Sequence, residues 1–444
     1  MRHIVRVIIA AIFAVGSIVR PALGQGFSLI SDAEIEATIR AFSDPIFVAA
    51  GLSTDSVRVH IVNDRNLNAF VADGQRIFVF TGLLMQADHA GQVVGVIAHE
   101  TAHIAGGHLV RMQDALRNAT ATSIVALILG AAAVAAGGGG GAIVAGAGAQ
   151  AGQQTFLQYT RTQESVADQA AVKYLTSTGQ SARGLIETLG KLSGQEALLS
   201  SSQSSYVRTH PLTRERIQLL SLEVENSPYA ATPVRADFND AFARMKAKLV
   251  GFLAPERALR DYPERDRSVA ARYARAIAYH KLAQWDRSHR EIDELLSVAP
   301  GDPFFQELKG QILLESGKPA EAIAYYTEAT RLAPRQPLLE LGLAQAQIAT
   351  NDTTLNRAAI PHLEEAVRHD PDIIQAWQLL SIAYGRNQQF GLSSLASAER
   401  ALRTGRMDEA RGHATRAERE LPVGSPGYLR AQDIVNAARP RPRQ

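Results

Sequence analysis

Two histidines and a glutamate in this chain have the spacing that metal-assisted hydrolysis requires. His99, Glu100 and His103 form the pattern His-Glu-x-x-His. On a helix, residues at positions i and i+4 lie on one face, so both imidazoles can reach a single cation. Glu100 lies beside them, where its carboxylate can take a proton from a water that the cation activates. The alternative is a buried helix whose two histidines are satisfied by ordinary hydrogen bonds.

A catalytic zinc site needs three protein ligands, so a third must come from elsewhere in the chain. Glu164 and Asp168 stand at i and i+4 in a segment that we expect to be helical. We assign Glu164 as the third ligand beside His99 and His103, which gives one Zn²⁺ per chain. Asp168 is expected to hydrogen-bond the outer nitrogen of a ligand histidine and fix its tautomer. Taken alone, the Glu164 and Asp168 pair would also suit a solvated helix face.

His210 and Arg216 form a third group of candidate site residues. Pro211 predicts a helix that starts just after His210. A histidine and an arginine that reach the zinc would stabilise the oxyanion of a tetrahedral intermediate. A neutral His210 imidazole could instead fill the open fourth zinc position and hold the enzyme latent. The plain alternative is a capping or surface histidine.

The elements that must position these residues can be predicted from local patterns. Asp32 or Ser31 is a typical N-cap, Asp73-Gly74 is a hairpin signal, and a helix break is expected near Gly106-Gly107. A second short apolar helix is expected to end at Gly51. The expected helices cover about 32–42, 89–117 and 162–175, and the expected strands cover about 57–62, 68–71 and 76–80.

Composition excludes several classes of site and partner. The 46 Lys and Arg residues nearly balance the 44 Asp and Glu residues, for a formal charge of +2, so a nucleic-acid binder is not expected. The chain has no cysteine, which excludes a thiol nucleophile, a cysteine-ligated zinc ribbon and a disulfide scaffold. Any metal site must therefore be built from His, Asp and Glu.

The N-terminus has the pattern of an export signal. Basic residues are followed by an apolar run over 7–19 and by small residues ahead of Gln25. We therefore expect residues 1–24 to be cleaved and the mature chain to be periplasmic. An uncleaved membrane anchor is the alternative.

Residues 119–149 form a second unusual segment, which contains no charged residue and has five glycines at 137–141. The segment is long enough for one membrane span. A single span would put residues 99–103 and residue 164 on opposite sides of the bilayer, so we expect a lid or a membrane-surface element. A buried loop and a re-entrant segment remain alternatives.

The second half of the chain has a helical repeat with a period near 34 residues. Pro300 and Pro334 are one period apart, and Gly310, Ala322 and Tyr326 fall at the small and large positions of a tetratricopeptide repeat. About five copies would form a curved solenoid with a binding face. An irregular helical bundle is the alternative. The expected organisation is a signal peptide over 1–24, a peptidase domain over 25–225, a helical linker over 226–266, a repeat domain over 267–436 and a disordered tail over 437–444.

In combination, these motifs resemble the HExxH zinc endopeptidases related to the CAAX prenyl proteases. With the export signal and the repeats, the chain looks most like the periplasmic beta-barrel assembly-enhancing protease group. The resemblance implies an α+β zincin-type domain, mostly helical with a small sheet, followed by an all-α tetratricopeptide-repeat solenoid. It also implies zinc ligands at His99, His103 and Glu164 and a general base at Glu100. His210 and Arg216 match the family's histidine and arginine near the scissile carbonyl, and the substrate-binding edge strand matches Asn68, Ala69 and Phe70.

The expected function is that of a periplasmic zinc endopeptidase that degrades unfolded or misassembled proteins in outer-membrane protein quality control. The expected partners are such polypeptides and, through the repeats, the outer-membrane assembly machinery, with membrane-surface contact through 119–149. One alternative is a repeat-based chaperone or adaptor with a latent or minor peptidase activity. Another is a membrane-embedded peptidase with 119–149 inserted in lipid.

Overall fold

The computed structural model describes residues 28–72, 74–111, 161–198, 210 and 214–439. The segment 1–24 that we expect to be an export signal, the uncharged segment 119–149 and the last residues of the expected tail lie outside these ranges. The chain divides into two compact units. The first comprises Met1–Ser31 and Ile39–Arg235, and the second comprises Asp32–Thr38 and Ala236–Gln444.

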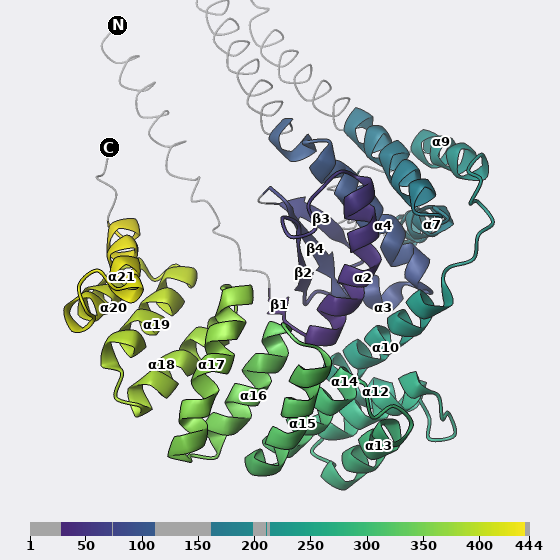
Figure 1. The fold of residues 1–444 in the computed structure, drawn as a ribbon. Helices are drawn as coiled ribbons and strands as arrows, with labels where there is room; N and C mark the ends of the chain where they lie inside the picture. Colours follow the sequence, from purple (N-terminus) through teal and green to yellow (C-terminus); the bar gives the residue numbers. More distant parts are fainter. Residues whose placement is uncertain (1–27, 73, 112–160, 199–209, 211–213, 440–444) are drawn as a thin grey trace, which may run out of the picture. The chain divides into compact units, whose positions relative to one another are not determined.

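A four-stranded mixed sheet forms part of the first unit (Figure 1). The strand order is β1-β2-β4-β3. Strands β3 and β4 are an antiparallel hairpin, as predicted, and Gly74 has a φ of +86° in its turn. Strand β3 lies at the end of the order and is therefore an edge strand among the strands that the structure describes. The strands are β1 Leu29–Ile30, β2 Arg58–Val62, β3 Ala69–Ala72 and β4 Arg76–Phe80.

Helix α2, Ala33–Ala49, begins at the predicted cap and is longer than predicted. Asp32 Oδ1 accepts hydrogen bonds from the backbone nitrogens of Glu34 and Ile35 at 3.1 and 3.0 Å. The expected division into two short helices is wrong, because α2 continues through Pro45 and ends before Gly51, whose φ is +73°. The helix can continue because buried apolar residues keep their helical spacing along it, at Ile35, Ile39, Phe42 and Ile46.

Helix α4, Ala90–Ala105, follows the short helix α3, Thr81–Gln86, and packs closely against α7, Arg183–Leu198 (Figure 1). Glycines permit this approach. A Cβ on Gly95 would lie 2.7 Å from the backbone nitrogen of Leu185, and one on Gly184 would lie 2.1 Å from the carbonyl oxygen of Gly91. The predicted break at Gly106-Gly107 is confirmed, since α4 ends there and a helical turn follows over 108–111.

The second unit is entirely helical among its described residues. It begins with α10, Ala236–Leu253, and α11, Pro255–Asp261, which occupy the segment predicted as a linker. Ten further helices follow in the described part, and short connections join them (Figure 1). They are α12 Val269–Lys281, α13 Trp285–Val298, α14 Pro303–Glu315, α15 Pro319–Leu332, α16 Pro337–Ala349, α17 Thr353–His369, α18 Ile374–Arg386, α19 Phe390–Arg403, α20 Met407–Glu420 and α21 Pro426–Ala437.

The alternation of small and large residues that predicted the repeats has a direct packing explanation. A Cβ on Gly310 of α14 would lie 2.8 Å from the Tyr326 ring of α15, and one on Gly342 of α16 would lie 2.4 Å from the same ring. The tyrosine therefore fills a slot that only glycines on both flanking helices leave open. The predicted tetratricopeptide-type arrangement of paired helices is confirmed.

A buried ion cluster fixes the first turn of α2 within the second unit. Lys248 is 3% exposed and its Nζ lies 2.8 Å from Asp32 Oδ2. Glu34 is held by Arg244 at 2.7 Å and accepts a hydrogen bond from the Tyr273 hydroxyl at 2.6 Å. These ion pairs explain why residues 32–38 belong to the unit that α10 and α12 build.

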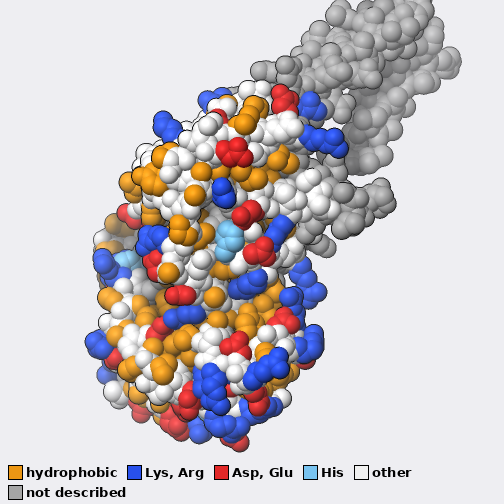
Figure 2. Space-filling view, turned by 90° about the vertical axis from the view of Figure 1, so that its right-hand side faces the viewer, with side chains coloured by type: hydrophobic (Ala, Val, Ile, Leu, Met, Phe, Trp, Pro, Cys, Tyr) orange, Lys and Arg blue, Asp and Glu red, His pale blue; other side chains and the backbone are white. Residues whose placement is uncertain are grey.

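The surface in Figure 2 mixes both signs of charge, with Lys and Arg side chains interspersed among Asp and Glu side chains. This matches the near-zero net charge of the sequence. None of the helices that the structure describes is both long and apolar enough to cross a membrane.

Candidate metal centre

Four side chains from separate segments converge in the first unit. His99 and His103 come from α4, Glu164 comes from a helix over residues 161–177, and His210 lies just before α9, Arg214–Glu225. One donor atom from each of them lies within 4.8 Å of all the others. His99, Glu164 and His210 are buried, and the His103 side chain is 12% exposed. The structure thus brings together all three predicted zinc ligands and His210.

The separations between the donor atoms suit a tetrahedral metal ion. In a tetrahedral zinc site with bonds of about 2.0–2.1 Å, neighbouring ligand atoms lie about 3.3–3.4 Å apart. His99 Nε2 lies 3.1 Å from His103 Nε2 and 3.4 Å from His210 Nδ1. Glu164 Oε1 lies 3.3 Å from His103 Nε2 and 3.1 Å from His210 Nδ1. Imidazole and carboxylate donors at these distances fit a divalent cation such as zinc.

The charges around this cluster also fit a divalent cation. Glu100, Glu164 and Asp168 are buried carboxylates, and Arg216 is the buried guanidinium among them. With neutral histidines, three carboxylates against one guanidinium leave a net charge of −2. Both Glu100 oxygens lack a hydrogen-bond partner among the described residues. Burial lowers the pKa of His99, but hydrogen bonds to Asp168 and Glu164 outweigh burial and raise it to about 9. The site therefore attracts positive charge.

Asp168 and Arg216 form an ion pair that contacts two of the proposed metal ligands, His99 and Glu164. Asp168 Oδ1 lies 2.9 Å from His99 Nδ1, which is the contact expected from the sequence. Arg216 donates from Nε and Nη2 to Asp168 at 2.5 and 2.9 Å, and its Nη1 lies 2.8 Å from Glu164 Oε2. Burial alone would raise the pKa of Asp168, but the hydrogen bonds from Arg216 and His99 outweigh burial and hold this pKa below its usual value. The contacts described here join the Arg216 guanidinium to two carboxylates, so the oxyanion role expected for Arg216 stays a prediction.

His108 is a neighbour of the site that our sequence analysis missed. Its Nδ1 lies 3.0 Å from Nδ1 of His103, and the residue is 4% exposed. Burial lowers the pKa of His108 to about 4. A signal was present in the sequence, since this histidine follows His103 by five residues with two glycines between them.

The predicted substrate strand lies at the edge of the sheet, against the helix that carries the two metal-site histidines. Asn68 and Ala69 are buried, and α4 packs against β3. The Phe70 ring stacks on Phe78 with centroids 5.0 Å apart, and His60 stacks on Phe78 at 5.1 Å. An edge strand offers unpaired backbone groups to an extended peptide.

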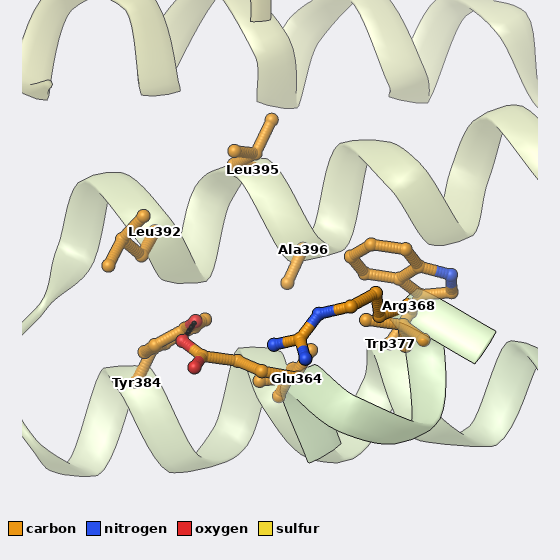
Figure 3. A pocket seen from close by; sticks show the side chains of 9 residues that line it. Glu364, Arg368, Trp377, Tyr384, Leu392, Leu395 and Ala396 are labelled. Carbon is orange, nitrogen blue, oxygen red and sulfur yellow. Dashed lines mark hydrogen bonds between the residues drawn. The ribbon is translucent and has the colours of Figure 1, made fainter. Parts of the chain in front are cut away.

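A separate hollow of about 360 Å³ lies among α17, α18 and α19 in the second unit. Trp377, Leu392 and Leu395 provide apolar lining, as Figure 3 shows. The Tyr384 hydroxyl donates a hydrogen bond to Glu364 at 2.5 Å within this hollow.

Known proteins resemble both parts of the chain. Residues 31–224 match peptidase family M48, and residues 313–354 match a tetratricopeptide repeat. A beta-barrel assembly-enhancing protease of Escherichia coli (strain K12) is 26% identical over 375 residues, which cover 82% of this chain and 75% of that protein. The protein of that name from Yersinia pestis is 25% identical over 89% of this chain and 82% of its own length.

Other relatives match a smaller share of the chain. A mitochondrial metalloendopeptidase OMA1 of Schizosaccharomyces pombe is 26% identical over 39% of this chain and 48% of its own length. With the metal-capable cluster and the paired helices described above, these likenesses show a metallopeptidase whose residues 31–224 resemble peptidase family M48 and whose residues 313–354 resemble a tetratricopeptide repeat.

Proposed function

We propose that the chain is a periplasmic zinc endopeptidase that cleaves unfolded or misassembled proteins in outer-membrane protein quality control. The observation that carries this proposal is the set of four converging donor atoms at tetrahedral spacing, beside a buried glutamate whose oxygens accept no hydrogen bond from the described residues. The beta-barrel assembly-enhancing proteases support the outer-membrane part of the proposal by their name and by their coverage of this chain. The pattern of residues 1–24 supports the periplasmic part.

The chemistry follows from the ligand set and from Glu100. His99, His103 and Glu164 would hold one zinc ion, which would polarise the scissile carbonyl and make water a better nucleophile. Glu100 takes a proton from the attacking water as the new C–O bond forms. Glu100 then gives that proton to the leaving amine as the C–N bond breaks. Because the Glu100 carboxylate is buried, bulk water does not reach it.

His210 would supply a fourth donor to this arrangement. Its Nδ1 lies 3.1 Å from Glu164 Oε1 and 3.4 Å from His99 Nε2, and its Nε2 lies 3.4 Å from Glu100 Oε1. A catalytic zinc site must keep one position open for water or substrate. We therefore assign His210 as a displaceable fourth donor that holds the enzyme at rest. It lies outside any helix or strand, so its displacement breaks no regular element.

Replacing His210 tests this resting state. His210→Ala should raise the basal cleavage of an unfolded protein, because the fourth position no longer has a protein donor. A cleavage rate equal to the wild-type rate would rule out the resting role. Loss of all cleavage, with zinc still bound, would assign His210 to the oxyanion instead.

Substrate would bind as an added strand on β3. Main-chain hydrogen bonds to the edge strand give affinity with little demand on sequence, which suits unfolded polypeptides of many kinds. Asn68, Ala69 and Phe70 lie at this edge, and α4 packs beside it. A cyclic or tightly folded protein should therefore resist cleavage that its unfolded form undergoes.

The repeats would bring the peptidase to its partners. Tetratricopeptide repeats commonly bind proteins along an extended surface. We propose the outer-membrane assembly machinery as the partner, and a domain organisation of signal 1–24, peptidase 25–225, linker 226–266, repeats 267–436 and tail 437–444. Cross-linking in cells tests this partner. An adaptor without peptidase activity is the second candidate, and it would capture the same partner while cleaving nothing.

Cleavage of two unfolded substrates tests the substrate class. The purified chain should cleave an unfolded outer-membrane β-barrel protein, and Glu100→Gln should not. A reduced soluble protein kept unfolded serves as the comparison. Equal cleavage of both would support a general endopeptidase and remove the argument for outer-membrane substrates.

A further inference from the structure

The contact between His108 and His103 is made by the outer nitrogen of a proposed metal ligand. His103 presents Nε2 to the cluster, 3.1 Å from His99 Nε2 and 3.3 Å from Glu164 Oε1. Its other nitrogen, Nδ1, lies 3.0 Å from Nδ1 of His108. The two rings are nearly perpendicular, with an interplanar angle of 79°. The second histidine therefore faces the first from the side opposite the proposed metal.

The position of the proton follows from this geometry. An imidazole that ligates a metal through Nε2 keeps its single proton on Nδ1. That Nδ1–H of His103 points at His108, whose Nδ1 must then accept the hydrogen bond. A hydrogen bond between two ring nitrogens needs one donor and one acceptor, so His108 is neutral and carries its own proton on Nε2. The contact thus favours the tautomer of His103 that leaves Nε2 free for the metal.

The turn after α4 places the His108 side chain beside His103. Gly107 has a φ of +60°, which side chains other than glycine rarely adopt, and it lets the chain turn back at the end of α4. A Cβ on Gly106 would lie 2.4 Å from His108 Nε2, so this glycine leaves room for the ring. Both glycines of the pair therefore have a role in placing one side chain.

We propose that His108 is a positioning residue that fixes the tautomer and orientation of His103, an inference that rests on the proposed metal site. Asp168 has the corresponding contact on the other ligand histidine, with its Oδ1 2.9 Å from His99 Nδ1. Outer partners of this kind raise metal affinity because they orient the ligand ring and fix its proton. A neutral histidine does so on His103 without adding a fourth carboxylate to the buried cluster.

Two variants of the full chain, whose new side chains have nearly the same shape as each other, test the proposal. In His108→Asn the side-chain oxygen takes the place of Nδ1, since both atoms are bonded to Cγ, so the acceptor is kept. In His108→Leu the branching at Cγ is kept and the acceptor is lost. We expect the Leu variant to bind Zn²⁺ about 10–100-fold more weakly than wild type in competition with a chromophoric chelator. The Asn variant should bind close to wild type.

Two further variants separate positioning from folding. Gly106→Ala keeps the His108 ring but displaces it, and should weaken zinc binding as His108→Leu does. His89→Ala removes a histidine from the other end of α4, where Nε2 lies 2.7 Å from Glu187, and should leave zinc affinity unchanged. Thermal unfolding of the metal-free proteins is recorded for each variant, and the Leu and Asn variants should melt together.

Three results of these measurements would overturn the inference. Wild-type zinc affinity in His108→Leu would overturn the inference and leave the metal site standing. Equal weakening in the Leu and Asn variants, with equal losses of metal-free stability, would make His108 structural and also overturn it. Failure of the wild-type chain to bind one Zn²⁺ would instead overturn the metal site, and the inference with it.

Discussion

Replacing Arg216 by methionine should destabilise the metal-free peptidase unit strongly. The guanidinium makes three close contacts with two buried carboxylates, at 2.5 and 2.9 Å to Asp168 and 2.8 Å to Glu164. Methionine keeps the unbranched aliphatic part of the side chain but has no charge, so the buried cluster loses one positive charge. Removing one partner of a buried ion pair costs about 3–5 kcal/mol. At about 2–4 °C per kcal/mol for a unit of this size, the melting temperature should fall by about 6–20 °C.

Zinc should restore part of this loss, because a divalent cation supplies the positive charge that Arg216→Met removes. Calorimetry with a chelator and then with added zinc measures both effects. Arg257→Met is the matched control, since Arg257 and Asp261 form a pair at 2.9 Å with side chains 55% and 45% exposed. An exposed pair is worth about 0–1 kcal/mol, so this control should melt like wild type. If metal-free Arg216→Met melts within about 2 °C of wild type, the carboxylates do not depend on the guanidinium and the reasoning fails.

Three further variants and one control variant test other parts of the account. Burial raises the pKa of Glu36 from 4.5 to about 7, so between these pH values the folded state binds more protons than the unfolded state. The free energy of unfolding therefore falls as pH rises from 4.5 to 7. Glu36→Gln should gain stability over wild type in this range, which urea titrations at several pH values would show. Gly310→Ala should cost about 1–3 kcal/mol in the same assay because its Cβ would contact Tyr326, whereas Gly412→Ala, with open space around its Cβ, should be neutral or stabilising. Gly95→Ala should push α4 from α7 and weaken zinc binding in a chelator competition, and unchanged affinity would show that the site tolerates this shift.

Local patterns predicted the parts of the site that lie within one or two elements. The i, i+4 spacing of His99 and His103 required only that α4 be a helix, and the hairpin of β3 and β4 required only a short turn at Gly74. The expected contact between Asp168 and a ligand histidine was also accessible, because Asp168 lies one turn from Glu164 on the same helix.

Local sequence patterns could not predict the contacts between segments that are distant in the chain. Arg216 lies 48 residues from Asp168, and its orientation toward the carboxylates depends on how α9 packs rather than on any local spacing. The first turn of α2 belongs to the second unit because Lys248 and Arg244 bind it, which no periodicity in residues 32–38 reveals. His108 was missed for a different reason, since the two glycines predicted only a break within a helix over about 89–117, and not a turn that brings the next side chain back to His103.

The most direct test of the central claim is cleavage of an unfolded protein by the purified chain as its metal is removed and restored. The account predicts that cleavage stops when a chelator strips the metal and returns with zinc. It also predicts that Glu100→Gln binds one Zn²⁺ with wild-type affinity and still does not cleave. Cleavage that persists in the stripped protein or in the Glu100→Gln variant would contradict a metallopeptidase that uses this site.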